Sequence, residues 1–386
     1  LGETCQLVDP ILSALYVADD PDRPCSGALA KAQDMSAIED VLRARIAATG
    51  PITIADYMAE TLMHPEHGYY ATRDPFGAAG DFITAPEISQ MFGELVGLSM
   101  AQSWLDQGAP DRFILAELGP GRGTLMSDVL RATRSVPGFV DAAEVHFVET
   151  SPELRKAQAL RVPDATWHDT MADLPEGPLW LVANEFFDAL PIRQFVRPGP
   201  GWRERIVGLR HGDIQPGFGD QTTHGFLAHR LQDTRDGDLV ELCLALPAIV
   251  QDIGRRIGTH GGAALIIDYG DWRSLGDTFQ AIRAHEATDP FLDPGEADLT
   301  AHVDFEAIAL SATPAKFSKL TTQGVFLERL GITTRAQQLA SKLAGADLEH
   351  VVLAHRRLTH PDEMGDLFKV IALYPAGRVP PPGCDP

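Results

Sequence analysis

Short apolar runs without polar alternation mark a series of expected strands in the middle of the chain. They cover residues 113–119, 145–148, 179–183, 263–267 and 368–373, with further strands near 165–168 and 316–321. Helical periodicity occurs between them, at 124–134, 154–160 and 304–312. Such runs are typical of parallel strands buried on both faces, and their alternation with helices indicates βαβ units. The pattern therefore predicts an α/β fold with a mostly parallel sheet.

The chain before the first of these strands has a different pattern. Ser36 and Glu39 have the spacing of a capping box at the start of an amphipathic segment. Residues 52–63 again favour a helix, and Pro86 opens a long one. Residues 36–108 are therefore predicted to form a mostly helical N-terminal cap.

Two insertions interrupt the predicted core. Residues 190–245 contain three strand-like segments joined by Gly-rich turns, and residues 271–303 are polar and aromatic with two Asp-Pro pairs. The first predicts a strand-rich subdomain and the second a functional loop or lid. The expected organisation is a poorly ordered extension (1–35), the helical cap (36–108), a core (109–189 and 246–374), an inserted substrate-side subdomain (190–245) and a tail (375–386).

Composition and charge narrow the class of partner. The chain has 386 residues, enough for two or three domains or for one large domain with insertions. Its formal charge is −22, from 54 acidic and 32 basic residues. A field of that sign repels phosphates, so neither nucleic acid nor an anionic membrane is an expected partner. No apolar stretch approaches the roughly 18 residues of a membrane span. The four scattered cysteines, with no CxxC pair, favour reduced thiols in a cytosol-like compartment and no metal site.

The strongest local signal is a glycine loop between the first buried strand and the helix after it. Glycine there lets the backbone approach a ligand closely. A dinucleotide loop has its third glycine at the sixth position, where this chain has Thr124, and no P-loop motif occurs. An acid ahead of the loop suits a cationic ligand such as S-adenosylmethionine (AdoMet), although an NAD-dependent dehydrogenase is the fold-level rival. The expected cofactor-binding residues here are Glu117, Gly119, Gly121, Gly123 and Thr124.

Acids at two further strand ends extend this cofactor site. Glu149 ends the second strand, where a carboxylate can accept hydrogen bonds from both hydroxyls of a ribose. Asp169 follows Trp167 and His168 at the end of the third strand, where we expect the adenine edge. The alternative is that Glu117 and Glu149 are merely solvated acids at strand ends. Together they favour a cofactor that carries adenosine.

A second polar cluster follows the fourth strand, beside the glycine loop. Asn184, Glu185 and Asp188 offer one amide and two carboxylates within five positions. Two close carboxylates are costly unless a cation lies between them, and a carboxylate matches a guanidinium bidentately. We expect these three to be catalytic and to orient a guanidinium nitrogen for in-line methyl transfer, with Phe186 and Phe187 excluding water. The alternative is a turn in which Asn184 and Asp188 cap backbone amides.

Three more residues are expected near the acceptor. Asp268 and Tyr269 end the fifth strand and are predicted to line the acceptor pocket, and His302 lies in the predicted lid. His64 and His67 are three positions apart but have no third ligand nearby. A His-Pro turn packed under the two tyrosines that follow is therefore favoured over a metal site.

Eight segments of the chain resemble the MidA-like family. They are HPEHGYY (64–70), DPFGAAGDFITAPEISQMFGE (74–94), ELGPGRGTLM (117–126), NEFFDALPIRQF (184–195), GWRERIVGL (201–209), LIIDYG (265–270), DPGEADLTAHVDF (293–305) and DEMGDLFKVIAL (362–373). The resemblance runs from about residue 36 to 374, and the combination of GDFITAPEIS with NEFFDALP is highly specific. It implies a Rossmann-like, seven-stranded AdoMet-dependent methyltransferase sheet and S-adenosyl-L-methionine as the cofactor.

The resemblance also implies a substrate and a compartment. Mitochondrial members of the family assist the assembly of respiratory complex I. This implies a protein-arginine methyltransferase that makes symmetric dimethylarginine, with the NuoD-like, 49-kDa-type subunit of complex I as its protein substrate. The compartment would be the cytoplasm for a bacterial member and the mitochondrial matrix for a eukaryotic one.

The family resemblance also implies a function for the loop before Pro86. Asp81, Phe82, Thr84 and Glu87 are expected to fold over the methionine end of AdoMet, with an acid near its ammonium group. The alternative is that Phe82 and its neighbour only plug the cap onto the sheet.

Two other functions stay open at this level. One is methylation of a small amine, and the other is an AdoMet-binding assembly chaperone without catalysis. The long strand-rich insertion favours a protein-sized acceptor over a small one.

Overall fold

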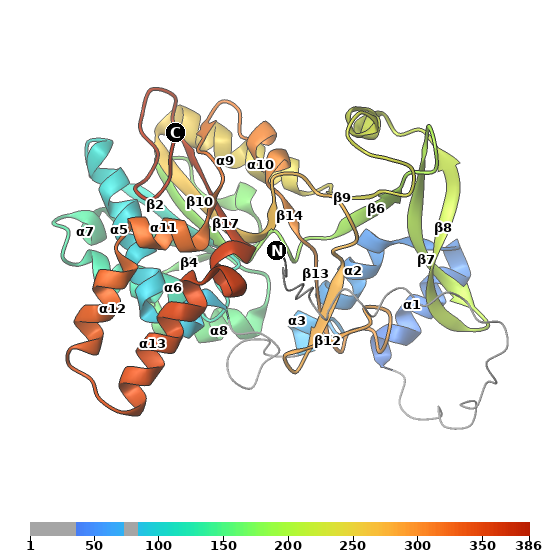
Figure 1. The fold of residues 1–386 in the computed structure, drawn as a ribbon, viewed down its shortest axis with the longest axis horizontal. Coiled ribbons are helices and arrows are strands. Elements are labelled where there is room, and N and C mark those ends of the chain that lie inside the picture. The colour runs from blue at the N-terminus through green and yellow to red at the C-terminus, as the bar shows by residue number, and fades with distance from the viewer. Residues whose placement is uncertain (1–35, 73–83) are drawn as a thin grey trace, which may run out of the picture. The chain divides into compact units, whose positions relative to one another are not determined.

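The computed structural model describes residues 36–72 and 84–386, and a mixed sheet forms their centre (Figure 1). Its main path runs β15 (Lys316–Phe317), β17 (Phe368–Tyr374), β10 (Gly262–Asp271), β5 (Leu179–Asn184), β2 (Phe113–Leu118), β3 (Ala143–Val148), β4 (Thr166–His168). Two short strands, β14 (Val303–Asp304) and β16 (Thr321–Thr322), pair with β10 and β17. The strands from β10 to β4 are parallel, and β17 is antiparallel to β10. The predicted α/β class is confirmed, with nine strands among the described residues where the resemblance implied seven.

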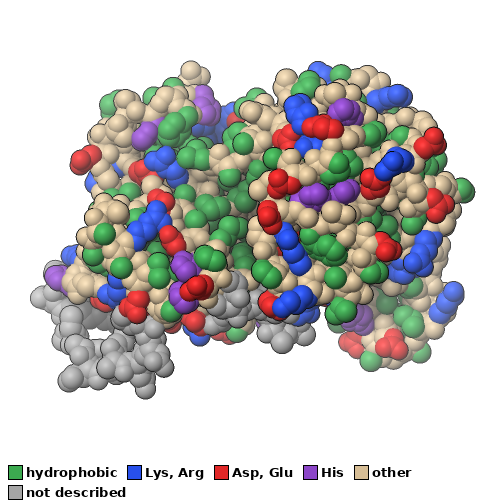
Figure 2. Space-filling model, turned by 180° about the vertical axis from the view of Figure 1, so that it is seen from behind, with side chains coloured by type: hydrophobic (Ala, Val, Ile, Leu, Met, Phe, Trp, Pro, Cys, Tyr) green, Lys and Arg blue, Asp and Glu red, His purple; other side chains and the backbone are tan. Residues whose placement is uncertain are grey.

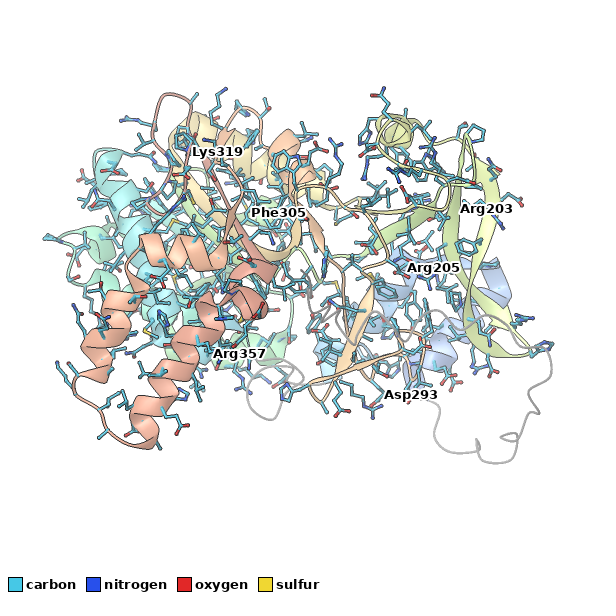
Figure 3. All side chains as sticks on the ribbon, viewed as in Figure 1. Arg203, Arg205, Asp293, Phe305, Lys319 and Arg357 are labelled. Atoms are coloured by element: carbon cyan, nitrogen blue, oxygen red, sulfur yellow. The ribbon has the colours of Figure 1, made fainter. Side chains whose placement is uncertain are left out.

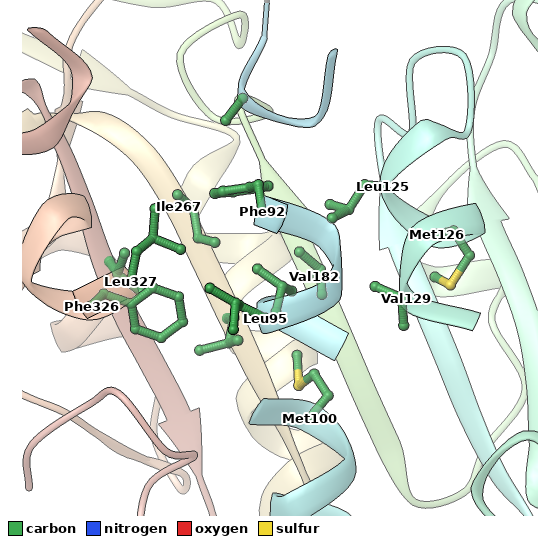
Figure 4. Packing of buried hydrophobic residues seen from close by; sticks show 14 of the residues in the cluster. Phe92, Leu95, Met100, Leu125, Met126, Val129, Val182, Ile267, Phe326 and Leu327 are labelled. Carbon is green, nitrogen blue, oxygen red and sulfur yellow. The ribbon is translucent and has the colours of Figure 1, made fainter. Parts of the chain in front are cut away.

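Helices cover both faces of this sheet, which explains the continuous apolar runs. On one face, Val182 and Ile267 pack against α5 (Gln90–Asp106) and α6 (Thr124–Thr133), as Figure 4 shows. On the other, Leu181 and Ile266 meet α9 (Leu246–His260) and α10 (Phe305–Ser311). Gly97 permits the close packing of α5 on α6, because a Cβ there would lie 2.9 Å from Cα of Val129.

The remaining helices are short or lie at the ends of the described chain. They are α1 (Ala37–Thr49), α2 (Ile54–Met63), α3 (Tyr69–Thr72), α4 (Ala85–Ile88), α7 (Phe139–Ala142), α8 (Pro152–Arg161), α11 (Gln323–Arg329), α12 (Ile332–Ala340) and α13 (Ala346–Thr359). A 3₁₀ turn covers Met171–Asp173, a longer 3₁₀ helix covers Gly225–Leu231, and a π turn covers Pro361–Gly365. None of the helices in the described part is both long and apolar enough to cross a bilayer. On the face in Figure 2, acidic and basic side chains are interspersed, without one broad basic patch.

The predicted helix from Pro86 is in fact two helices. Ser89 is extended, with φ −161° and ψ 136°, and it separates α4 from α5. Its hydroxyl accepts a hydrogen bond from the Met91 amide at 3.2 Å. Serine competes well for the N-cap position, so the chain restarts a helix there. Ser36 caps α1 by accepting from the Glu39 amide at 3.3 Å, which is half of the predicted capping box; the Glu39 carboxylate pairs with Arg43 instead.

The insertion forms a second sheet with the order β1, β7, β6, β9, and β8 pairs with β7. Its strands are β6 (Ile192–Val196), β7 (Trp202–Arg210), β8 (Asp213–Thr222) and β9 (Leu239–Cys243), joined by β1 (Ile52–Thr53) from the N-terminal segment. Figure 1 shows α1 and α2 beside this sheet, whereas α5 lies on the central one. The strand β8 was not predicted, because it is polar and mostly exposed.

The segment predicted as a loop or lid contains a small antiparallel sheet. Its strands are β11 (Gln280–Arg283), β12 (Glu286–Thr288) and β13 (Asp298–Thr300). The buried carboxylate of Glu241 on β9 holds this segment by accepting from the Thr278 amide at 3.0 Å and from the Phe279 amide at 3.2 Å. The Ala301 amide also donates to the carbonyl of Asp188 at 3.0 Å. The segment is thus tied to the turn after β5.

Candidate active site

The glycine loop lies at the carboxyl end of β2, where ligands of open α/β sheets bind. Gly119, Gly121 and Gly123 have φ values of 61°, 52° and 78°, in the left-handed region that side chains disfavour. A Cβ on Gly119 would lie 3.0 Å from Cδ2 of Phe186. The loop therefore needs glycine, and it lies against the turn that carries the predicted catalytic residues.

Glu117 is buried beneath the loop, with 3% of its surface exposed. Burial raises the pKa of its carboxyl to about 8, although a hydrogen bond from the Met126 amide opposes this shift. Its Oε2 has no hydrogen-bond partner among the described residues. Glu117 is therefore no solvated acid, and a buried acceptor of this kind favours a cationic or hydrogen-bond-donating ligand.

Glu117→Gln is expected to stabilise the ligand-free protein increasingly as pH rises. The raised pKa means that the proton-linked stability is fully present below the usual carboxyl range and is lost as pH rises through about 8. The amide carries no charge, so the gain at pH 9 should be about 5 kcal/mol. Thermal unfolding of both proteins from pH 5 to 9 measures it. A difference that shrinks with pH would contradict this assignment.

Glu149 follows β3 and is half-buried beside the loop. Its Oε1 accepts from the Ser151 amide at 2.8 Å, and its Oε2 from Gln158 Nε2 at 3.2 Å. Burial raises the pKa of Glu149. Asp169 is different: its carboxylate is 77% exposed and forms an ion pair with Arg155 at 2.6 Å.

The start of α4 contacts both predicted sites. Thr124 Oγ1 donates to Glu87 Oε1 at 2.5 Å, so Glu87 lies at the first turn of α6. Thr84 occupies the N-cap position of α4 without a capping hydrogen bond from its side chain. Asp81 and Phe82 lie outside the described residues.

The turn after β5 brings Asn184, Glu185 and Asp188 together. Asn184 Nδ2 donates to Glu185 Oε1 at 3.0 Å, and the Ala85 amide lies 3.4 Å from the same oxygen. Glu185 has a φ of 51°, a strained value for a non-glycine residue of the kind found at functional sites. Asn184 Oδ1 and Asp188 Oδ1 are buried without hydrogen-bond partners in the described part of the chain.

Asp268 stabilises the turn after β5 by accepting hydrogen bonds from its backbone. It is fully buried, and its Oδ2 accepts from the amides of Phe187 at 3.0 Å and Asp188 at 3.4 Å. The capping role considered for Asn184 and Asp188 thus belongs largely to Asp268, although Asp188 also accepts from the Ala189 amide. Asp268 therefore fixes the backbone of the turn from the neighbouring strand β10.

The pKa values of all three carboxyl groups at this turn, those of Glu185, Asp188 and Asp268, are raised. Burial raises the pKa of Glu185 to about 8, with a further contribution from the charge of Asp188, and burial raises the pKa of Asp188 to about 6. The pKa of Asp268 is raised well above its usual range for the same reason. Arg357 on α13 (Figure 3) opposes the shift of Glu185 weakly. No side chain in the described ranges forms an ion pair with these three acids.

The two phenylalanines that are predicted to exclude water lie on different sides of the turn after β5. Phe186 faces Gly119, and its ring meets Phe187 edge to face at 5.2 Å. Phe187 and His302 line a cavity of about 180 Å³ toward the inserted sheet. The ring of Tyr269 packs edge to face on His302 at 5.4 Å. The Tyr269 hydroxyl lies beside Asp188 but forms no well-aligned hydrogen bond to any described residue.

Tyr70 and Asp298 belong to this region although the sequence did not single them out. The Tyr70 hydroxyl donates to Asp298 Oδ1 at 3.0 Å, and the charge of Asp188 helps to raise the pKa of Tyr70. The carbonyl of Tyr70 accepts from Ser151 Oγ at 3.3 Å, next to Glu149. Tyr70 thus connects the cofactor side with the acceptor side. Its position in HPEHGYY was visible, but a contact across 228 positions was not.

Comparison with known proteins agrees with this geometry. Residues 95–324 match the family model described as a putative S-adenosyl-L-methionine-dependent methyltransferase. The chain is 36% identical over 370 residues to the mitochondrial protein arginine methyltransferase NDUFAF7 of Xenopus laevis, covering 87% of this chain and 84% of that protein. The human NDUFAF7 is also 36% identical, with coverages of 87% and 82%.

A solved structure shows the same fold with a ligand. The protein is from Burkholderia thailandensis, was crystallised with S-adenosylhomocysteine (AdoHcy), and is 30% identical to this chain. The match covers 88% of this chain and 92% of that one, with a TM-score of 0.75. The buried acceptors around the glycine loop fit a ligand of this type. The chain belongs to the MidA-like family of S-adenosyl-L-methionine-dependent methyltransferases.

Proposed function

We propose that this chain methylates arginine in a protein substrate at the turn after β5. The observation that carries the proposal is the pair of Asp188, which is buried, and Glu185, which is half-buried, without a cationic partner among the described side chains. Ionising both is costly unless a cation enters, and a guanidinium matches carboxylates well. Protein arginine methyltransferase is also the name of the relatives in Xenopus and human.

The cofactor would lie at the carboxyl ends of β2 and β3. When bound, AdoMet supplies a methyl group on a positively charged sulfur. The glycine loop would take its methionine end, with Glu117 below and Glu87 beside it, and Glu149 would accept from the ribose hydroxyls. Asp81, Phe82 and Thr84 are proposed to close this end, and Asp169 to lie near the adenine edge.

Glu185 and Asp188 would act on the acceptor. Their charges would hold positive charge on two guanidinium nitrogens, which leaves the third aligned with the methyl group. Asn184 fixes the orientation of Glu185. As the new N–C bond forms, the bond between the methyl carbon and sulfur would break and AdoHcy would be the leaving group. The attacking nitrogen would lose a proton, and a carboxylate of this pair would accept it. Phe186, Phe187, Asp268, Tyr269 and His302 are proposed to shape the pocket.

We further propose symmetric dimethylation of a NuoD-like, 49-kDa-type subunit of complex I as the specific reaction. The family resemblance supports this, and the second sheet beside the cavity offers a protein-sized surface. The reaction would take place in the cytoplasm of a bacterium or in the mitochondrial matrix.

Methyl transfer is expected to increase with pH between about 6 and about 8. In that window Asp188 and Glu185 lose their protons, and only the ionised forms pair with a guanidinium. The increase should be visible in kcat/KM for the protein substrate, measured at saturating AdoMet. Glu185→Gln should remove the part of the increase that lies near pH 8. A profile that is flat across this window would contradict the role of these acids.

The activity itself is tested with tritiated AdoMet and a cell lysate, in parallel with the purified subunit. Label in a protein whose acid hydrolysate contains symmetric dimethylarginine is the expected result. Label in the small-molecule fraction would replace the proposal with small-amine methylation. No label despite measured AdoHcy binding would replace it with a chaperone role. Labelling of proteins in the lysate but not of the purified subunit would refute only the proposed substrate.

A further inference from the structure

Gln158 connects three parts of the cofactor site through one side chain. It lies on α8, four positions after Leu154 on the same face, and is fully buried. Its Nε2 donates to the Gly121 carbonyl at 2.7 Å and to Glu149 Oε2 at 3.2 Å. Its Oε1 accepts from Trp167 Nε1 at 2.8 Å. All the atoms of the carboxamide that can bond therefore have partners.

These partners stand at the ends of three adjacent parallel strands. Gly121 is in the loop after β2, Glu149 follows β3, and Trp167 is within β4. A cofactor lying across this edge of the sheet would need all three at fixed separations. The helix backbone also meets the loop, since a Cβ on Gly123 would lie 3.4 Å from Cα of Gln158.

The direction of the hydrogen bonds makes the amide difficult to replace. Both Gly121 O and Glu149 Oε2 are acceptors, so the group between them must donate twice. On the other side, Trp167 only donates, so the same group must also accept. Among uncharged side chains of this length, a carboxamide alone does all of this.

We propose that Gln158 is a positioning residue for AdoMet, which holds the glycine loop and the Glu149 carboxylate in the arrangement that binds the nucleoside. It does not itself need to touch the cofactor. This inference depends on AdoMet binding at the loop and not on which acceptor is methylated.

Gln158→Met tests the proposal, because methionine fills the space without the hydrogen bonds. The affinity for AdoHcy, measured by calorimetry, should fall roughly ten- to hundredfold, as expected for lost hydrogen bonds to a charged group. The matched control is Gln323→Met. Gln323 is equally buried and donates to the Leu358 carbonyl at 2.9 Å, on α11 away from the loop. The control should lose thermal stability but keep its AdoHcy affinity within about threefold.

Gln158→Glu gives a second readout that a purely structural role would not move. A protonated glutamic acid can donate once and accept once, whereas the ionised form only accepts and faces Glu149. The ratio of its AdoHcy affinity to that of the wild type should therefore fall at least tenfold between about pH 6 and pH 9. Comparing the ratio at each pH removes only the pH dependence that the variant and the wild type share. A constant ratio, or a Gln158→Met affinity equal to that of Gln323→Met, would overturn the proposal.

Discussion

Glu185→Gln is expected to lower methyl transfer by a factor on the order of 10²–10⁴ and to leave AdoHcy binding nearly unchanged. Glutamine keeps the length of the side chain and the oxygen that accepts from Asn184 Nδ2. It loses the negative charge that would pair with the guanidinium and the site that would accept its proton. Single-turnover methylation and calorimetry with AdoHcy separate the two effects.

Two further variants sharpen this experiment. Asp188→Asn should reproduce the loss of turnover, because its carboxyl interacts electrostatically with that of Glu185 at the same turn. Glu153→Gln is the control, since its carboxylate lies on α8 at 69% exposure and pairs only with Lys156 among the described residues. Loss of AdoHcy affinity in Glu185→Gln or Asp188→Asn would place these acids in the cofactor site and remove them from the proposed chemistry.

Gly119→Val is expected to abolish measurable AdoHcy binding and with it all turnover. A branched side chain at a φ of 61° costs roughly 1–3 kcal/mol in strain. Its Cβ would also lie 3.0 Å from Phe186 and displace that ring, so both the loop and the catalytic turn would move. Calorimetry with AdoHcy, together with thermal unfolding, measures the two consequences.

The control variant separates the effect of backbone strain from the effect of a substitution in the glycine loop. Gly50 has a φ of 84° and nothing within 4 Å of a built Cβ, at the end of α1. Gly50→Val should therefore lose similar stability and keep AdoHcy affinity. Equal loss of affinity in both variants would mean that global destabilisation, and not the loop, is responsible.

Much of the fold follows from local pattern. The strand β2 is buried at all six positions, so its sequence carries no polar alternation, and the glycine loop follows it directly. The strand β8 offers no such signal, because its side chains face solvent at an edge. The pattern around Ser89 predicts one continuous helix, because nothing local shows that its hydroxyl would cap a new one.

Some residues of the candidate site could also be predicted from the sequence pattern, and others could not. Glu117, Glu149 and the acids after β5 could be named, because strand ends gather at one edge of a parallel sheet. Gln158 could have been found as a polar residue on the apolar face that Leu154 begins. Tyr70 could not, since its partner Asp298 lies in a segment that resembled a loop and is in fact part of a sheet.

A crystal structure of the AdoHcy complex tests the central claim most directly. The account predicts that the ribose hydroxyls contact Glu149, that the amino-acid end lies at Gly119 and Gly121, and that the sulfur faces Glu185. Nucleoside density at another edge of the sheet, or a sulfur turned away from the β5 turn, would contradict it.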